Sequence, residues 1–411
     1  MKVTEWAEQL PSGLALDGET LAPYYQPIIA LDSGRIMGYE VLGRAVKDGK
    51  ARSLGPFFGN ADIPAEDHLL VDRLLRDRAI ARLGQERNPP MLFLNLKPEW
   101  ISRHGCDGVP HTLQLIEKHG ADPRSIVIEI TEENYSGSMD KLRSVVDGYR
   151  ERGCRIAIDD VGSGFSSVDR IAQIQPNLLK IDMNMVKRSA THNGYFGVLR
   201  SFSELAEQIG ASLLFEGVET IEDFERAIQS GARYVQGFLF AQAASDFIPP
   251  DSFAPIIERE LERHLRALAE TEQGWHRKAE ALAGLLYIPE RAAEPADGGD
   301  GWLERLLPEL DDNCMKVYLC NKDGIQLSSN FRRDADMRWV REEQFRHANW
   351  SWRPYFVPNL VQLGEQRRAI VSRAYADLDS QEWIRTVSVL VRPDLILFAD
   401  MKDIGSRGER R

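Results

Sequence analysis

The chain has 411 residues, of which 43% are hydrophobic and 28% are charged, and its 63 acidic residues against 51 basic ones give a formal net charge of −12. This composition predicts a globular protein of more than one domain and excludes long disordered tracts. The negative balance argues against binding to nucleic-acid polymers or anionic membrane surfaces, and no apolar run approaches the length of a membrane span.

The cysteines and the N-terminal segment indicate a cellular compartment. Cys106, Cys154, Cys314 and Cys320 show neither CxxC spacing nor the density of a disulfide scaffold. The first residues, MKVTEWAEQL, lack the apolar stretch of a signal peptide. We therefore expect a cytoplasmic protein whose thiols are buried or incidental, without membrane insertion.

Eight short β-rich runs alternate with amphipathic helical segments between residues 24 and 240. The runs are YYQPII, RIMGYEVLGR, MLFLNL, IVIEIT, RIAID, LLKID, SLLFEG and RYVQGFLF. This alternation is typical of β/α units with parallel strands. The predicted fold class is therefore α/β, and eight strands over about 220 residues favour a closed barrel.

The residue composition of the chain changes after Pro249 and Pro250, from alternating β-rich and helical runs to a helix-forming segment. Residues 253–286 have the composition and spacing of a connecting helix or helical hairpin, which could pack on its own barrel or serve signalling and dimerisation. Residues 289–301 are linker-like. We expect three parts: a barrel at 1–248, a helical connector with linker at 249–301 and a small α+β domain at 302–411.

The β-prone runs of the C-terminal part predict an antiparallel sheet. This part is expected to have a hairpin at Asn321 to Gly324, where the turn residues NKDG separate two of these runs. Its aromatic stretch and a later strand segment could line a small pocket in which Arg and Asp hold a zwitterion, or could be the core of the sheet. The residues concerned are Asn349, Trp350, Trp352, Arg353, Tyr355, Phe356, Tyr375 and Asp377.

Polar residues fall inside or at the C-terminal end of the barrel's apolar runs. They are Glu40, Asn95, Glu129, Asp159, Lys180, Glu216 and Gln236. A buried carboxylate must be paired, hydrogen-bonded or metal-bound, and the C-terminal strand ends of β/α barrels are where active sites are built. Any one of these residues could be a structural acid, but the set predicts a site.

The chemistry of the set favours divalent metal ions. Asp159 and Asp160 are adjacent, so one acid could bridge two ions while its neighbour binds the second. A pair of such ions suits phosphodiester hydrolysis, and hard oxygen ligands suit magnesium or manganese. These runs contain no His or Cys, which argues against zinc.

The ordered segments resemble the successive signature motifs of the EAL family. They are YYQPII, GYEVLGR, FLNL, EITE, DDVGSGFSS, LLKID, EGVET and QGFLF, from about Tyr24 to Phe240. Val41 stands where the family name has an alanine, and Gly43 replaces a usual apolar residue. The resemblance implies a modified TIM (β/α)8 barrel that hydrolyses cyclic di-GMP to linear pGpG with two Mg²⁺ or Mn²⁺ ions and no organic cofactor.

The resemblance also implies a role for each site residue. Glu40, Asn95, Glu129 and Asp159 would hold one metal ion, and Asp159, Asp160 and Glu216 the other. Lys180 would orient and help activate the attacking water, so Lys180, Glu216 and Glu40 form the expected catalytic group. The remaining positions are substrate contacts at Gln26, Leu42, Arg44 and Gln236, and loop-supporting acids at Glu132 and Glu219.

The C-terminal domain is similar to PAS- or Cache-like sensory modules, and the two-domain layout resembles YkuI-type proteins of the family. We therefore expect a cyclic di-GMP phosphodiesterase regulated by its C-terminal domain, a homodimer, and an unknown small ligand at that domain. The alternative is a catalytically silent receptor that signals on binding cyclic di-GMP. Such receptors usually lose metal or loop residues, and none is missing here.

Overall fold

The computed structural model describes residues 19–97, 110–131, 138–162, 168–189, 192–286, 299–364 and 367–403. The chain divides into two compact units, Met1–His264 and Leu265–Arg411. None of the described helices has the length and apolar character needed to cross a membrane.

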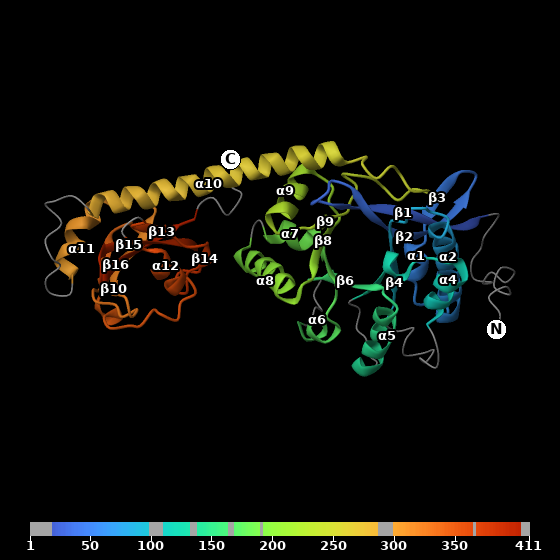
Figure 1. Ribbon diagram of the computed structural model, residues 1–411, viewed down its shortest axis with the longest axis horizontal. Helices are drawn as coiled ribbons and strands as arrows, with labels where there is room; N and C mark the ends of the chain where they lie inside the picture. Colours follow the sequence, from blue (N-terminus) through green and yellow to red (C-terminus); the bar gives the residue numbers. More distant parts are fainter. Residues whose placement is uncertain are drawn as a thin grey trace. The chain divides into compact units, whose positions relative to one another are not determined.

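The first unit is built on a closed barrel (Figure 1). Its sheet has the strand order β1-β9-β8-β7-β6-β5-β4-β2-β3, and an additional pairing of β1 with β2 closes it, leaving β3 outside. The bounds are β1 Thr20–Ala30, β2 Ile36–Lys47, β3 Lys50–Ser53, β4 Met91–Leu96, β5 Ile126–Ile130, β6 Arg155–Val161, β7 Leu178–Asp182, β8 Ser212–Glu216 and β9 Tyr234–Val235. The predicted barrel is confirmed.

One strand departs from the expected parallel arrangement. β1 runs antiparallel to both β2 and β9, whereas β2 and the strands from β4 to β9 pair in parallel. Only a short turn joins β1 to β2, and a parallel pair would need a long crossover connection. The barrel is therefore a modified TIM barrel.

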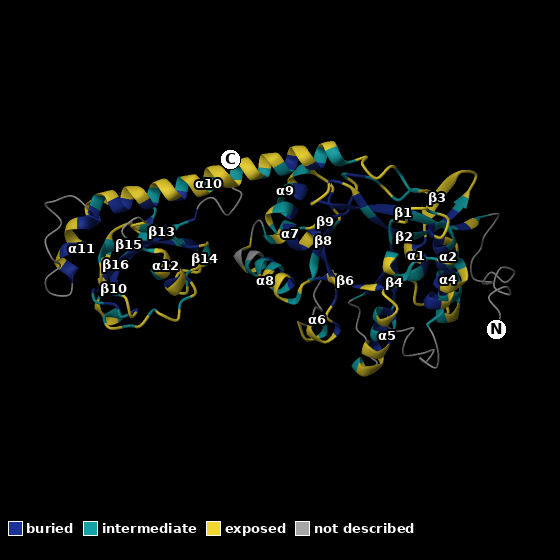
Figure 2. Cartoon of the chain, in the orientation of Figure 1, coloured by how far each residue is buried: buried dark blue, intermediate teal, exposed yellow. Residues whose placement is uncertain are grey.

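Helices cover the outside of the barrel, and two apolar layers hold it together (Figures 1 and 2). The helices are α1 Gly55–Phe58, α2 Ala65–Leu83, α4 His111–His119, α5 Met139–Glu151, α6 Val168–Ile174, α7 Met183–Ser189, α8 Asn193–Ile209 and α9 Ile221–Gln229. A large core joins helices to strands. A smaller one, with Phe93, Val127 and Leu214, comes from alternate strand positions and fills the barrel interior.

Helix α10, Ala254–Leu286, occupies much of the predicted connector as one continuous helix rather than a hairpin. Ile257, near its start, belongs to the barrel core. Trp275, Ala279 and Leu282, in its last turns, belong to the core of the second unit. Exposed residues dominate between these two ends (Figure 2).

The second unit contains a seven-stranded sheet of order β12-β11-β10-β16-β15-β13, with β14 paired to β15. Its described strands pair in antiparallel fashion, as expected. Its elements are α11 Asp300–Leu306, β10 Cys314–Asn321, β11 Asn330–Arg333, β12 Trp339–Glu342, α12 Phe356–Gln362, β13 Ala369–Val371, β14 Tyr375–Ala376, β15 Trp383–Arg392 and β16 Leu395–Lys402.

The predicted hairpin of this unit is present around its NKDG turn. Its tight turn is present, because the Gly324 N–H donates to the Asn321 carbonyl at 3.1 Å. The returning segment pairs with β10 directly after the turn, because the Asn321 N–H donates to the Ile325 carbonyl at 3.0 Å and the Leu327 N–H donates to the Leu319 carbonyl at 2.8 Å. Beyond Leu327 the Ser328 hydroxyl accepts a further bond from the Leu319 N–H at 2.9 Å, and the next strand, β11, begins at Asn330.

Candidate active site and metal centre

The predicted polar residues converge at the C-terminal ends of the barrel strands. Asn95 on β4 lies in register with Glu129 on β5. Glu40 lies on β2, Asp159 on β6, Lys180 on β7, Glu216 at the end of β8, and Gln236 directly after β9. Parallel strands bring these positions to one edge of the barrel, above its apolar interior layer.

Lys180 lies at the centre of the carboxylates. Its Nζ is 2.9 Å from Asp159 Oδ1, 3.0 Å from Glu129 Oε1 and 3.2 Å from Glu216 Oε2. Glu40 Oε2 is farther away, at 3.9 Å. The lysine side chain is fully buried, so a surface role for it is excluded.

Two amides orient the Glu40 carboxylate. Gln236 Nε2 donates to Glu40 Oε2 at 2.7 Å, and Asn95 Nδ2 donates to Glu40 Oε1 at 3.2 Å. Gln26 lies opposite Glu40 in the β1–β2 register, and its amide donates to the Ala241 carbonyl at 3.3 Å. Asn95 and Gln236, which the sequence predicted as site residues, therefore contact Glu40 directly.

Asp159, Asp160 and Glu216 form a second group. One carboxylate oxygen of each lies within 4.8 Å of the others, a spacing at which one cation could contact all three. Asp160 has a φ of 57°, an uncommon backbone conformation for a residue with a side chain, and its N–H donates to Asp159 Oδ1 at 3.0 Å. Such strain at a strand end is typical of functional sites.

The electrostatics of the cluster reveal a shortage of positive charge. Burial raises the pKa of Glu129 well above its usual range, with Lys180 opposing and Glu40 adding to the effect. Burial likewise raises the pKa of Glu216 to about 8. Burial would lower the pKa of Lys180, but the surrounding carboxylates outweigh it and raise that pKa well above its ordinary value. One ammonium thus does not balance these acids.

The donor set fits divalent cations. Both Glu129 carboxylate oxygens and Lys180 Nζ are buried without a partner of hydrogen-bond geometry among the described residues, although their mutual distance is that of an ion pair. Buried oxygens of this kind need a further partner. Carboxylate and amide oxygens are hard ligands that suit magnesium, manganese or calcium.

A cavity of about 230 Å³ adjoins the cluster at Asn95. Leu42 and Arg44, two predicted substrate contacts, line it together with apolar side chains such as Phe58. Burial lowers the pKa of the Arg44 guanidinium, but Arg44 remains a cation at neutral pH. The cavity is therefore a place where part of a phosphate-bearing ligand could enter.

Three cavity residues had not been anticipated: Asp72, Arg76 and Lys97. Arg76 is only 4% exposed; it donates to Asp72 Oδ2 at 2.6 Å and to the Asn95 carbonyl at 2.9 Å. It thus supports the backbone of a predicted metal ligand. In the sequence, Asp72 and Arg76 lie four positions apart within a leucine-rich helical segment. Such a pair resembles an ordinary ion pair on a helix surface, so the sequence did not mark these residues as part of a site.

One predicted supporting acid, Glu219, lies apart from the cluster. The Glu219 side chain is 57% exposed, and its carboxylate lies 3.8 Å from Lys187. Glu132 falls outside the described residues.

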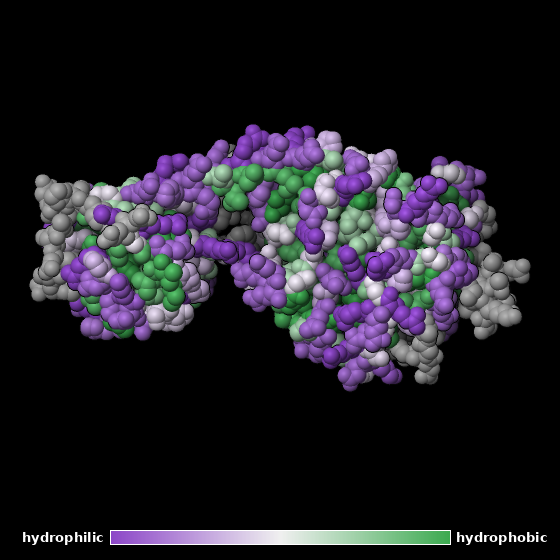
Figure 3. Space-filling view, in the orientation of Figure 1, coloured by the Kyte–Doolittle hydropathy of each residue, from purple (hydrophilic) through white to green (hydrophobic). Residues whose placement is uncertain are grey.

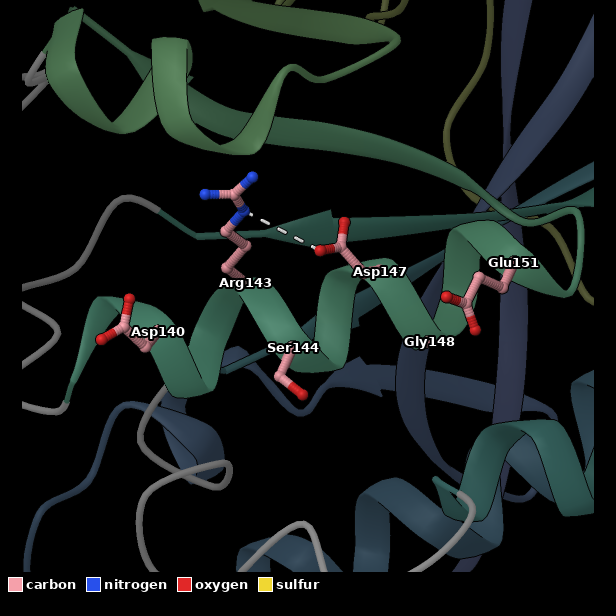
Figure 4. Close-up of a pocket in the computed structure, with 6 residues that line it drawn as sticks. All are labelled: Asp140, Arg143, Ser144, Asp147, Gly148 and Glu151. Atoms are coloured by element: carbon pink, nitrogen blue, oxygen red, sulfur yellow. Dashed lines mark ion pairs between the residues drawn. The ribbon is translucent and has the colours of Figure 1, made fainter.

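A shallow groove of about 440 Å³ runs along α5 (Figure 4). It is lined by Asp140, Arg143, Ser144, Asp147, Gly148 and Glu151, and Arg143 pairs with Asp147 at 3.8 Å. The groove contains none of the predicted site residues.

Comparison with known proteins agrees with this geometry. Residues 8–243 match the EAL domain model, and residues 247–403 match the model of an EAL-domain associated signalling protein domain. The chain is 33% identical over 242 residues to the cyclic di-GMP phosphodiesterase RocR of Pseudomonas aeruginosa, a match covering 55% of this chain and 58% of RocR.

A second relative matches along nearly the whole chain. The uncharacterized EAL-domain containing protein YkuI of Bacillus subtilis is 32% identical over 400 residues, covering 95% of this chain and 96% of YkuI. The crystal structure of YkuI in complex with cyclic di-GMP and calcium superposes with a TM-score of 0.85 over 93% of this chain and 96% of that one, at 30% identity. The chain therefore belongs to the EAL-domain family and carries, after its barrel, the associated signalling domain found in YkuI.

Proposed function

We propose that the barrel is a cyclic di-GMP-specific phosphodiesterase that hydrolyses its substrate to linear pGpG by in-line attack of water, assisted by two divalent cations. The observation that carries this proposal is the complete oxygen-donor cluster around Lys180, in which buried Glu129 oxygens lack a hydrogen-bond partner among the described residues. RocR, a relative, is named as a phosphodiesterase of this kind, and YkuI holds cyclic di-GMP with calcium.

The cations would be Mg²⁺ or Mn²⁺. Glu40, Asn95, Glu129 and Asp159 would hold one, and Asp159, Asp160 and Glu216 the other. Bound ions would supply positive charge for the phosphoryl oxygens and a more acidic water molecule.

The protein's side chains would position the water, the metal ligands and the substrate. Lys180, placed among the acids, would orient the attacking water and offset the negative charge of the site. Gln236 and Asn95 would hold Glu40 in place through their amide bonds. Gln26, Leu42 and Arg44 would contact the dinucleotide, with Arg44 forming charged hydrogen bonds to phosphate. Glu132 and Glu219 would support the loops around the site.

The second candidate function is that of a receptor that binds cyclic di-GMP without hydrolysing it. The retention of every metal-type residue in the cluster favours catalysis over this alternative.

Incubation of the full chain with cyclic di-GMP and Mn²⁺ tests the proposal. We expect pGpG from the unaltered protein, loss of turnover by at least about 100-fold in Glu40→Ala, and unchanged turnover in Glu117→Ala, a control at an exposed position of α4. Micromolar binding without any product would leave only the receptor, and absence of binding would exclude both.

We further propose that the second unit is a PAS- or Cache-like sensory domain that regulates the barrel, and that the protein is a cytoplasmic homodimer. The antiparallel sheet, with α12 residues packed against β10 and β16, supports the first idea. Cys154, Cys314 and Cys320 are unpaired and buried, which fits a reducing compartment. The bounds 1–248, 249–301 and 302–411 remain our proposal for the functional parts.

A further inference from the structure

A row of polar side chains crosses the centre of the second unit's sheet. Lys316 on β10 pairs in register with Asp400 on β16, which pairs with Thr386 on β15. Their exposed fractions are 9%, 4% and 0%. Directly opposed residues share a face of a sheet, and apolar residues at such central positions would usually stabilise it at least as well. The stability of the fold alone therefore does not account for polar side chains at these buried positions.

An arginine framed by aromatic rings lies beside this row. The Arg353 guanidinium is 5.0 Å from the ring centre of Tyr375, 5.3 Å from that of Trp352 and 5.6 Å from that of Tyr355. The Tyr375 hydroxyl is 2.5 Å from Thr386 Oγ1, which ties the arginine group to the row. Among the described residues no carboxylate forms an ion pair with Arg353.

The two acids that contact Lys316 are held very differently. Asp377 Oδ1 is 3.4 Å from Lys316 Nζ, and its other oxygen accepts bonds from both the N–H and the hydroxyl of Ser380. Asp379 is 3.2 Å from Lys316 Nζ, but its side chain is 61% exposed and Lys316 is its one partner among the described residues. An exposed single ion pair is weak. Asp379 is thus a carboxylate that an external one could replace.

Charges of both signs lie along the polar row, in which the Thr386 hydroxyl donates to Asp400 Oδ1 at 2.7 Å. Burial raises the pKa of Asp400, and both Lys316 and Arg353 oppose this effect, so both cations act on the same carboxylate. Asp377 adds a fixed negative charge. A small molecule placed here would meet cationic and anionic groups together with aromatic faces.

We propose that this part of the second unit is a binding site for a small zwitterion of α-amino-acid size. The ligand's carboxylate would replace that of Asp379 at Lys316 and would face Arg353, its ammonium group would lie at Asp377, and its apolar part would contact the rings of Trp352 and Tyr375. The proposal is independent of the phosphodiesterase activity of the barrel.

The test titrates the full chain with each L-α-amino acid up to 10 mM, following tryptophan fluorescence and thermal unfolding. At least one amino acid should bind saturably. Arg353→Ala should weaken its binding about tenfold or more, whereas Asp379→Asn should tighten it about three-fold, because the competing carboxylate is gone. Arg392→Ala and Asp394→Asn, which alter another exposed pair of the same unit, should leave binding unchanged.

Acetate and methylamine serve as ligands that carry one charge each, and both should bind much more weakly than the amino acid. The proposal is overturned if no amino acid binds at 10 mM, if either single-charge compound binds equally well, or if Arg353→Ala binds as the unaltered chain does.

Discussion

Lys180 determines the electrostatic state of the candidate active site. It is the cation within 4 Å of four carboxylates, and three of those contacts are at 3.2 Å or less. Removing one partner of a buried charge group is far more costly than losing a surface pair, because the remaining charges stay uncompensated. The stability of the barrel should therefore depend on this one ammonium whenever metal ions are withheld.

Replacement of Lys180 by methionine should lower the stability of the barrel by about 3 kcal/mol in EDTA. Added Mn²⁺ should restore much of this loss, since bound cations replace the missing positive charge. Calorimetry of the full chain with and without Mn²⁺ would measure both effects. Lys118→Met, which removes a partly exposed pair with Asp77, should change little. Equal stability of Lys180→Met and the unaltered chain in EDTA would contradict the prediction.

Asp72 is the acid of the cavity beside Asn95, where Arg44, Arg76 and Lys97 supply the cations. A carboxylate can accept two hydrogen bonds from the N1–H and amino group of a guanine base. If cyclic di-GMP is the substrate, Asp72→Asn should raise KM about tenfold or more, the usual effect of losing a hydrogen bond to a charged group.

The same variant should change base preference as well. Discrimination between cyclic di-GMP and its inosine analogue, which lacks the amino group, should shrink in Asp72→Asn. Asp77→Asn is a matched control, because Asp77 lies on the same helix and pairs with Lys118 and His119 outside the cavity. An unchanged KM and unchanged preference would remove Asp72 from substrate recognition.

At the scale of elements, the packing of α2 against α4 supports the site from outside. The Arg76 guanidinium on α2 reaches the Thr112 hydroxyl on α4 at 2.9 Å as well as the carbonyl at the end of β4. His111, the first residue of α4, adds a titratable group to this contact. Burial, together with nearby Arg73 and Arg76, lowers the pKa of His111 to about 4, with Asp77 opposing.

This lowered pKa predicts a stability change in mild acid. The unfolded chain binds a proton at His111 near pH 6.5 and the folded one only near pH 4, so stability falls as pH drops between these values. The expected loss is about 2 kcal/mol, since part of the ring remains in contact with water. His111→Gln should flatten the profile of the barrel's unfolding temperature between pH 6.5 and 4. An identical slope in the variant would exclude this contribution.

At the scale of the whole chain, each of the two units has its own core, and α10 contributes residues to both. Apolar side chains also remain exposed along this helix: Leu265 is 66% and Leu268 is 47% exposed, at a spacing of three residues. Figure 3 shows surfaces that are hydrophilic over much of the visible face, with apolar patches between. Exposed leucines on one helix face are typical of helix pairing.

We therefore expect light scattering at tens of micromolar to give the mass of a dimer. Leu265→Glu combined with Leu268→Glu should shift the protein toward the monomer, because two charges would lie in the pairing face. Val361→Glu, a change at a more exposed position of α12, should not alter the mass. A monomer mass for the unaltered chain would refute the proposed homodimer.

The sequence by itself determined the barrel and the identity of the acidic cluster. Strand period and turn residues act locally, and polar residues such as Glu129 and Asp159 inside apolar runs are too costly to bury without a use. The tertiary structure decided what depends on contacts between distant segments. Two examples are the burial of Lys180 at the centre of the carboxylates and the antiparallel direction of β1. A third is the cavity in which Asp72 and Arg76 lie beside Asn95, although they precede it in the sequence by 23 and 19 residues. The separation of such groups along the sequence does not indicate their distance in space, because only the closure of the barrel brings them together.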